Sequence, residues 1–312
     1  MSSAAVFSAG AFAATLVHGA ALACAFSGFG AMLFLTLLMP RATAGMEQAA
    51  SGRLERRCSV LASLSLALAV LGELGWLVVE SGVLARGRVP DLAATLAVVA
   101  LHTGFGHLVL AQAAMLLGAF FVLGGAGHGT RPALAAIVAG IAVLLEAGHL
   151  HAAAMASGPS FFLACEALHV LAAGAWLGSL LPLALLIRDA PPAAGLIAAH
   201  DYSRFAKPAV LVLLVTAFWQ GTVLVGSASA LVTTVYGRVA MAKIVLFAIL
   251  IGFALRHRYR MAPSLAGADG ETARRRLARS VLAETAFGIA IVLVAAVLAS
   301  LAPPTMAAMA MR

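Results

Sequence analysis

Two glutamate–histidine pairs stand out in an otherwise apolar chain. Glu146 and His149 are three residues apart, and Glu166 and His169 repeat this spacing twenty residues later. Residues three apart on a helix share a face, so each pair would present a carboxylate beside an imidazole. Imidazole binds zinc, copper, iron and nickel, and a neighbouring carboxylate often orients the ligating ring. The pairs therefore predict a metal site, with interhelical hydrogen bonding in a helical bundle as the alternative.

Further candidate ligands accompany these pairs. One histidine follows the first pair two residues later, and three more occur in other apolar segments. The C-terminal "TMAAMAMR" adds methionines, whose soft thioethers select Cu(I), although a frayed hydrophobic end explains them equally. The predicted metal ligands are His149, His169, Glu146, Glu166, His151, His107, His102 and His18, with Met306, Met309 and Met311 as weaker candidates.

The composition is that of an integral membrane protein. Of the 312 residues, 63% are hydrophobic and 10% are charged, whereas soluble domains carry about 25% charged residues. Long apolar runs without period-two alternation favour helices over a β-barrel. The net charge of +8 is concentrated in short loops between apolar runs, where basic residues set membrane topology. We therefore expect an all-α, polytopic bundle in a lipid bilayer and no nucleic-acid partner.

Eight apolar runs are long enough to cross a bilayer, which takes about 20 residues. With the N-terminus outside, most Lys and Arg fall in the inner loops, so the positive-inside rule favours eight helices with both termini outside, in the periplasm. No soluble domain and no strong internal repeat are visible, and 257–279 is predicted to be a basic cytoplasmic loop. We expect one membrane domain, 1–312, with spans at about 12–38, 59–82, 99–123, 132–154, 161–187, 208–227, 237–256 and 280–301.

The ionisable residues inside these spans concentrate in the outer half of the membrane. A charged group at the bilayer centre costs about 2.5–3.5 kcal/mol on insertion scales, so such residues are functional candidates. One-sided clustering favours a site that captures a ligand from the outer side over a channel through the full depth. The fourth and fifth spans must be antiparallel neighbours, since the turn "ASGPS" joins them. If their polar faces meet, each glutamate lies opposite the histidine of the other span.

Several segments resemble the CopD (PcoD) family of copper-resistance membrane proteins. The residues "GH" at 148–149 and "EALHVLAAGAWLGSLLPLALL" at 166–186 are similar to the family's most specific motif. The stretches "LHTGFGHLVLAQ", "YGRVAMAKIVLF" and "LARSVLAETAFGIAIVLVAAVLASLAPP" resemble further family segments in the same order. The resemblance assigns motif positions to His149, His169, Trp176 and Gly178, and structural roles to Lys243 and Glu284. Gln112 departs from the pattern, because a basic residue is common there.

This resemblance implies a multi-pass protein of the bacterial inner membrane that handles copper and is not an enzyme. Copper, expected as Cu(I), would be bound from the periplasmic side and moved into the cytoplasm, with a separate CopC-like periplasmic carrier as a partner. Two alternatives remain from the residues alone. Histidine pairs could ligate haem in a membrane cytochrome, and paired E-x-x-H helices recur in di-metal oxidoreductases.

Overall fold

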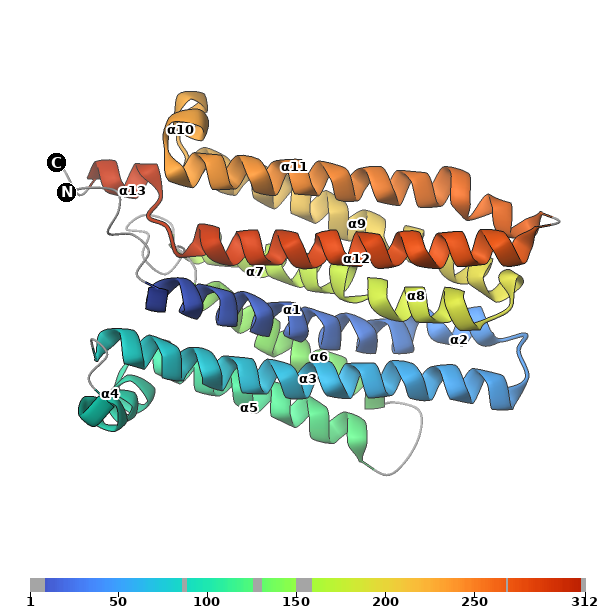
Figure 1. Ribbon diagram of the computed structural model, residues 1–312, viewed down its shortest axis with the longest axis horizontal. Helices are drawn as coiled ribbons and strands as arrows, with labels where there is room; N and C mark the ends of the chain where they lie inside the picture. The colour runs from blue at the N-terminus through green and yellow to red at the C-terminus, as the bar shows by residue number, and fades with distance from the viewer. Residues whose placement is uncertain (1–8, 86–88, 126–130, 150–158, 268, 310–312) are drawn as a thin grey trace.

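The computed structural model describes residues 9–85, 89–125, 131–149, 159–267 and 269–309 (Figure 1). These residues form helices and no strand. Eight helical segments are long and apolar enough to cross a membrane, which confirms the predicted number. In chain order the elements are α1 (Ala9–Leu37), α2 (Met39–Thr43), α3 (Gln48–Leu84), α4 (Val89–His102), α5 (Gly104–Gly124), α6 (Arg131–Leu145), a 3-10 helix (Glu146–His149), α7 (Pro159–Gly178), α8 (Leu180–Asp189), α9 (Pro192–Leu224), α10 (Ala228–Thr233), α11 (Val235–Arg256), a π-helix (His257–Met261), a 3-10 helix (Pro263–Ala266), α12 (Gly270–Ala299) and α13 (Pro304–Met309).

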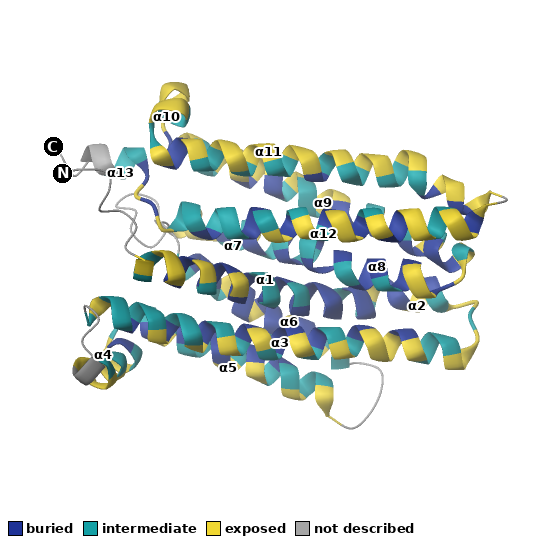
Figure 2. Cartoon of the chain, in the orientation of Figure 1, coloured by how far each residue is buried: buried dark blue, intermediate teal, exposed yellow. Residues whose placement is uncertain are grey.

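The bundle divides into two groups of long helices that run nearly parallel (Figure 1). Helices α1, α3, α5 and α6 pack on one another, and α7, α8, α9, α11 and α12 form the second group. Helix α1 joins the groups, because it also packs on α7 and α12. Buried residues are concentrated where α1 packs against both groups of helices, whereas α11 exposes most of its surface (Figure 2). The exposed apolar faces are those that would lie in lipid.

Two glycines allow α1 and α7 to touch backbone to backbone. A Cβ added to Gly178 would lie 1.8 Å from the carbonyl oxygen of Phe26, and one added to Gly30 would lie 2.2 Å from the carbonyl carbon of Gly178. In lipid the hydrophobic effect does not drive helices together, so close packing at small residues stabilises their association instead. The fifth span breaks at this contact. Pro182 has no N–H for the carbonyl of Gly178, and the Ser179 hydroxyl donates to the carbonyl of Gly30 at 2.9 Å.

Two predicted boundaries differ from the structure. The third span begins at Gly104 rather than near residue 99, because α4 ends at His102 and Thr103 caps a new helix by accepting a hydrogen bond from the N–H of Gly106 at 3.0 Å. The segment 257–279, expected as a loop, is largely helical. Its arginines lie on helical turns at the end of the bundle, where the Arg274 and Arg275 side chains pair with Glu271 one turn earlier.

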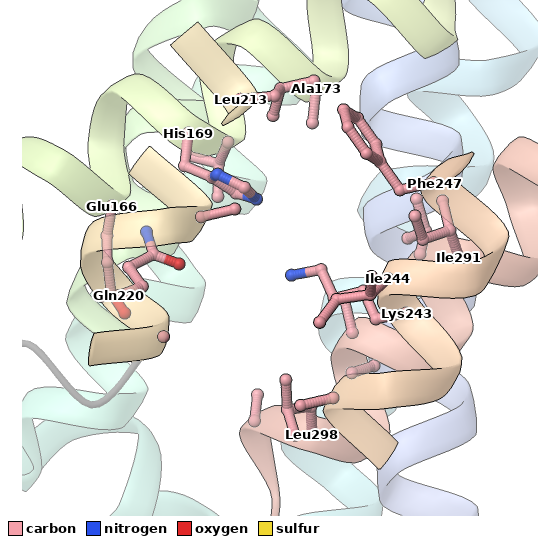
Figure 3. Close-up of a pocket in the computed structure, with 18 of the residues that line it drawn as sticks. Glu166, His169, Ala173, Leu213, Gln220, Lys243, Ile244, Phe247, Ile291 and Leu298 are labelled. Carbon is pink, nitrogen blue, oxygen red and sulfur yellow. The ribbon is translucent and has the colours of Figure 1, made fainter. Parts of the chain in front are cut away.

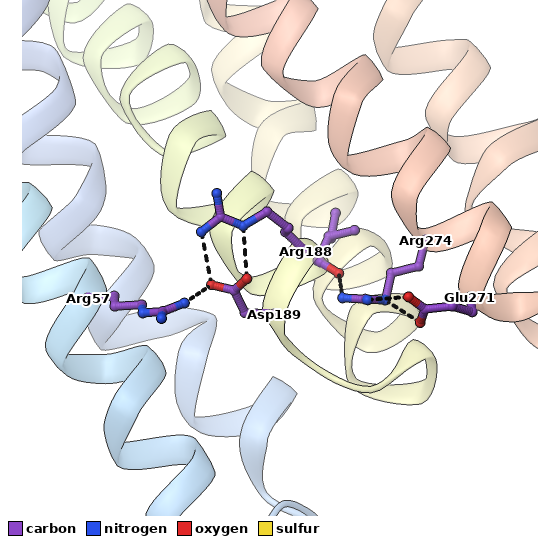
Figure 4. A network of polar contacts seen from close by, with 6 residues as sticks. Arg57, Arg188, Asp189, Glu271 and Arg274 are labelled. Atoms are coloured by element: carbon purple, nitrogen blue, oxygen red, sulfur yellow. Dashed lines mark hydrogen bonds and ion pairs between the residues drawn. The ribbon is translucent and has the colours of Figure 1, made fainter.

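The arginine-rich segments, such as the start of α3 and the start of α12, lie at the end of the bundle opposite α4, α10 and α13 (Figure 1), and some arginines form ion pairs between helices (Figure 4). Arg57 of α3 and Arg188 of α8 both donate hydrogen bonds to Asp189. Because both arginines are more than half exposed, we expect Asp189→Asn to cost about 1 kcal/mol or less. Thermal unfolding in detergent at low and high salt checks this expectation. A loss that is large and insensitive to salt would contradict it.

Candidate functional site

The end of α6 places the first glutamate–histidine pair on one side of the helix. The last turn tightens into the 3-10 helix Glu146–His149. In a 3-10 helix, residues three apart eclipse each other, so both side chains point in the same direction. They contact side chains of α1, α3 and α5, and the 3-10 helix also packs on α7.

An ion pair joins this first pair to α1, and hydrogen bonds join it to α5. The Nε2 atom of His18 lies 3.0 Å from Oε1 of Glu146. The amide nitrogen of Gln112 donates to Oε2 of Glu146 at 3.2 Å and to the carbonyl of Ala142 at 3.4 Å. The amide oxygen of Gln112 is thereby turned toward His149, whose Nε2 lies 2.6 Å away. Glu146 is almost fully buried, at 1% exposure, so its carboxylate is held by these side chains rather than by water.

This pattern fixes which nitrogen each histidine can offer. If Nε2–H of His18 donates to a carboxylate and Nε2–H of His149 donates to an amide oxygen, the Nδ1 atom of each ring carries a lone pair. Nδ1 of His18 is buried and has no hydrogen-bond partner among the described residues. Histidines that bind metals characteristically donate their other ring N–H to a carboxylate or carbonyl oxygen. In both rings Nε2 faces an oxygen, which is the kind of contact that also orients ligating histidines.

Aromatic side chains enclose the two imidazoles. The indole of Trp76 lies 3.9 Å from the His18 ring and 5.0 Å from the His149 ring, measured between ring centroids. Phe105 contacts both the His149 ring, at 5.6 Å, and the Trp76 ring, at 4.8 Å. The two histidine rings are 6.5 Å apart. Glu73, 1% exposed, is close enough to interact electrostatically with His18 and Glu146. The polar groups thus lie in an apolar, water-poor surrounding.

The second glutamate–histidine pair lies across a cavity from the first. His169 of α7 bonds through Nδ1 to the hydroxyl of Thr216 on α9 at 2.8 Å, which leaves Nε2 with a lone pair. Glu166, one turn earlier, is buried. Both residues line a cavity of about 410 Å³, together with His18 and Glu146. Figure 3 shows the ammonium of Lys243 pointing into this cavity, opposite Glu166, His169 and Gln220.

The expected arrangement, in which each glutamate faces the other span's histidine, is wrong. Glu146 pairs with His18, and His169 pairs with Thr216. The reason is the position of α1, which packs on both α6 and α7 and takes the contact of Glu146. Within the described ranges, no three His, Cys, Asp or Glu side chains are arranged to hold a metal ion as they stand. What the structure brings together is an imidazole pair with a shared carboxylate.

The other predicted ligands fall outside this cluster. His102 and His107 are exposed at the junction of α4 and α5, and Nε2 of His107 bonds to the carbonyl of Leu101 at 2.9 Å. Met306 is half-buried in α13, far along the chain from either pair. His151, Met311 and the side chain of Met309 lie outside the described residues.

Three partners of the histidines were not among the predicted site residues. Gln112 and Trp76 sit in apolar helices, and each carries a polar or aromatic group at the depth of the first pair, which is the signal that could have selected them. Thr216 gives no such signal, because a hydroxyl in a membrane helix usually bonds its own backbone. It does so here, donating to the carbonyl of Val212 at 2.7 Å while accepting from His169.

Comparison with known proteins identifies one family. Residues 197–298, from α9 to the end of α12, match the family model described as Copper resistance protein D (CopD). The predicted resemblance is confirmed over this range, which includes "YGRVAMAKIVLF" but not the motif at 166–186. The match is consistent with a copper-resistance membrane protein of the CopD family. Neither a curated protein nor a solved structure matches the chain.

Proposed function

We propose that this chain is a copper-handling protein of the inner membrane that binds copper with His18 and His149, with Glu146 supporting His18. The observation that carries the proposal is the matched placement of the two imidazoles, each with Nε2 beside an oxygen, which leaves Nδ1 for a ligand. Imidazoles that share one metal have ring centroids roughly 6 Å apart, because each metal–nitrogen bond is about 2 Å. The separation of 6.5 Å meets this requirement.

The distribution of charge supports uptake from the periplasmic side. The arginine-rich end of the bundle would face the cytoplasm under the positive-inside rule. The copper site would then lie in the outer half of the membrane, near α4, α10 and α13. The buried carboxylate of Glu146 supplies negative charge that attracts a cation there. A separate periplasmic carrier would deliver copper to this end.

Movement into the cytoplasm needs a second position, and the chain offers a further buried histidine–glutamate pair. Nδ1 of His257 lies 3.0 Å from Oε2 of Glu284, at the other end of the second group of helices. The opposite ring nitrogen, Nε2, bonds the hydroxyl of Ser280 at 2.8 Å. The first cluster and this pair would form two positions for the metal, with conformational change between them.

A haem cytochrome built on His18 and His149 is less well supported. A bis-histidine haem needs its porphyrin plane between the two rings, and Trp76 contacts both of them. A di-metal oxidoreductase needs both E-x-x-H pairs around one centre, and Glu146 and His169 have separate partners.

The test is metal content after loading purified protein with Cu(I), and separately with Zn(II), in mild detergent. We expect about one copper per chain in the wild type and background copper in His18→Ala/His149→Ala. His102→Ala/His107→Ala is the matched control, since it removes two exposed histidines, and it should keep wild-type copper.

Two further readouts separate the alternatives. His149→Ala/His169→Ala should lose copper through His149 alone, so His169→Ala by itself should retain most of it. Equal loss in His169→Ala and His18→Ala would contradict the proposed ligand set. A Soret band in the purified protein would favour haem instead.

A further inference from the structure

The two groups of helices contain the same corner. Thr103 begins α5 and Thr234 begins α11, and each hydroxyl donates to the carbonyl four residues earlier, at 2.6 and 2.7 Å. Each also accepts from the N–H of a glycine three residues later, at 3.0 and 2.9 Å. A Cβ on Gly106 or Gly237 would lie 2.0 or 2.1 Å from a carbonyl oxygen of the short helix before it. Such matching geometry reveals a structural repeat that the sequence does not show as self-similarity.

The repeat makes two polar residues equivalent. Counted from the threonine of each corner, Gln112 and Lys243 both lie nine residues later (112 − 103 and 243 − 234). Gln112 organises the histidine cluster of the first group, and Lys243 projects into the cavity of the second (Figure 3). The cavity of the second group therefore corresponds to the histidine cluster of the first group, with the Lys243 ammonium in the place of the Gln112 amide.

The two groups differ in how tightly they close. Helix α3 packs directly on α5, and Trp76 fills the space between them beside the histidines. The equivalent helices α9 and α11 share almost no contact among the described residues, and the cavity lies between them. Its mouth is bordered by Phe218, 76% exposed, and Ile244, 55% exposed, on faces that would meet lipid. A ligand dissolved in the membrane could enter sideways.

The cavity wall carries several buried polar atoms without a hydrogen-bond partner among the described residues, including Oε1 of Glu146 and Nδ1 of His18, and two others are hydrogen-bond donors. The amide nitrogen of Gln220 and the indole nitrogen of Trp176 are buried and have no hydrogen-bond acceptor among the described residues. The Lys243 ammonium adds further N–H groups. Burying a donor without an acceptor is unfavourable. An occupant that supplies acceptor oxygens would remove this cost.

Charge and shape narrow the class of occupant. Lys243 and Glu166 attract each other electrostatically, so the polar end of the cavity is close to neutral. The ammonium disfavours a metal cation, and the carboxylate disfavours a phosphate headgroup. Aromatic walls, including Trp176 and Phe247 in edge contact at 5.9 Å, suit a flat ring. A volume of about 410 Å³ is within the usual range for small-ligand sites.

We propose that this cavity binds a membrane-soluble isoprenoid quinone, whose carbonyl oxygens accept hydrogen bonds from Lys243 and Gln220 and whose tail leaves between α9 and α11. The proposal concerns a ligand other than copper, although two residues of the proposed copper site, His18 and Glu146, also line this cavity. It assigns the second half of the repeat to a neutral organic ligand and the first half to a metal.

Binding of decylubiquinone to the copper-free protein in detergent tests this proposal, with tryptophan fluorescence as the readout, because Trp176 lines the cavity. Quinone is varied as its mole fraction in the detergent. We expect saturable quenching, with the affinity reduced at least tenfold in Gln220→Leu and in Lys243→Met. Lys207→Met is the matched control, since Lys207 is an exposed lysine of α9 near the basic end, and it should bind as the wild type does.

Three outcomes would overturn the proposal. One is quenching that rises without saturation, and a second is unchanged affinity in both cavity variants. The third is equal competition by diacylglycerol at the same mole fraction, which would mean that the cavity takes ester carbonyls of bulk lipid. Thermal unfolding midpoints of the variants show whether they remain folded. If Lys243→Met unfolds, Gln220→Leu alone decides.

Discussion

Replacing Gly178 with alanine should destabilise the protein by about 4 kcal/mol or more, beyond the 1–3 kcal/mol typical of overpacked cores. The added Cβ would lie 1.8 Å from the carbonyl oxygen of Phe26 and 3.1 Å from the Cα of Gly30. Both neighbours are backbone atoms of α1, so no side-chain rotation can relieve the overlap. The two helices would have to separate along the contact that joins the halves of the bundle.

The measurement is the midpoint of unfolding by heat in detergent, followed by loss of monodisperse protein on gel filtration. Gly174→Ala is an internal comparison on the same helix, because its Cβ would meet only the side chains of Phe26 and Phe29, at 3.1 Å, and those rings can shift. Gly52→Ala is the control, since nothing lies within 4 Å of its added Cβ, and alanine in a helix is favoured over glycine by about 1 kcal/mol. A Gly178→Ala protein as stable as Gly52→Ala would contradict the close crossing of α1 and α7.

Physical constraints of the bilayer explain why the architecture could be predicted. An apolar run of about 20 residues can be satisfied in lipid only as a helix, so hydropathy alone gives eight spans. Boundaries were less predictable at α4 and α5, where 99–123 reads as one apolar run. There the hydroxyl of Thr103 and the missing side chain of Gly106 decide where one helix ends and the next begins.

The candidate site could be predicted only in part, because spacing along a helix does not determine rotation against other helices. The E-x-x-H pattern correctly identifies Glu146 and His149 as neighbours on one face. Whether that face meets α7 or α1 depends on packing, and the glycines at the α1–α7 crossing draw α1 into the centre. His18 thereby becomes the partner of Glu146, a contact between residues far apart in the chain.

The repeat was also invisible in the sequence, for a related reason. Its two copies share a corner that needs only a threonine and a glycine three residues later. Apolar residues elsewhere in a membrane helix are interchangeable where they face lipid, so little else is constrained to match. Gln112 and Lys243 are seen to be equivalent only when the two corners are aligned on Thr103 and Thr234. In the first copy, the amide of Gln112 bonds to Glu146 and to His149. In the second copy, the equivalent position holds the ammonium of Lys243.

Glu146→Gln should weaken copper binding by about 10–100-fold, the usual effect of removing a carboxylate that supports a ligating histidine. Glutamine keeps the shape and an oxygen that can accept from Nε2–H of His18, but it removes the negative charge at 3.0 Å from that ring. The basicity of the imidazole and the attraction for a cation both fall. The fold should survive, because a neutral amide is easier to bury than a carboxylate at 1% exposure.

Competition with a chromogenic Cu(I) chelator measures the affinity, and Glu166→Gln is the matched control from the second E-x-x-H pair. We expect Glu166→Gln to change copper affinity by less than a few-fold, because the partner of His169 is the hydroxyl of Thr216 rather than a carboxylate. Equal losses in the two variants would restore a symmetric site between the fourth and fifth spans. Unchanged binding in Glu146→Gln, with its fold intact, would remove Glu146 from the copper site and leave it a structural role between α1 and α5.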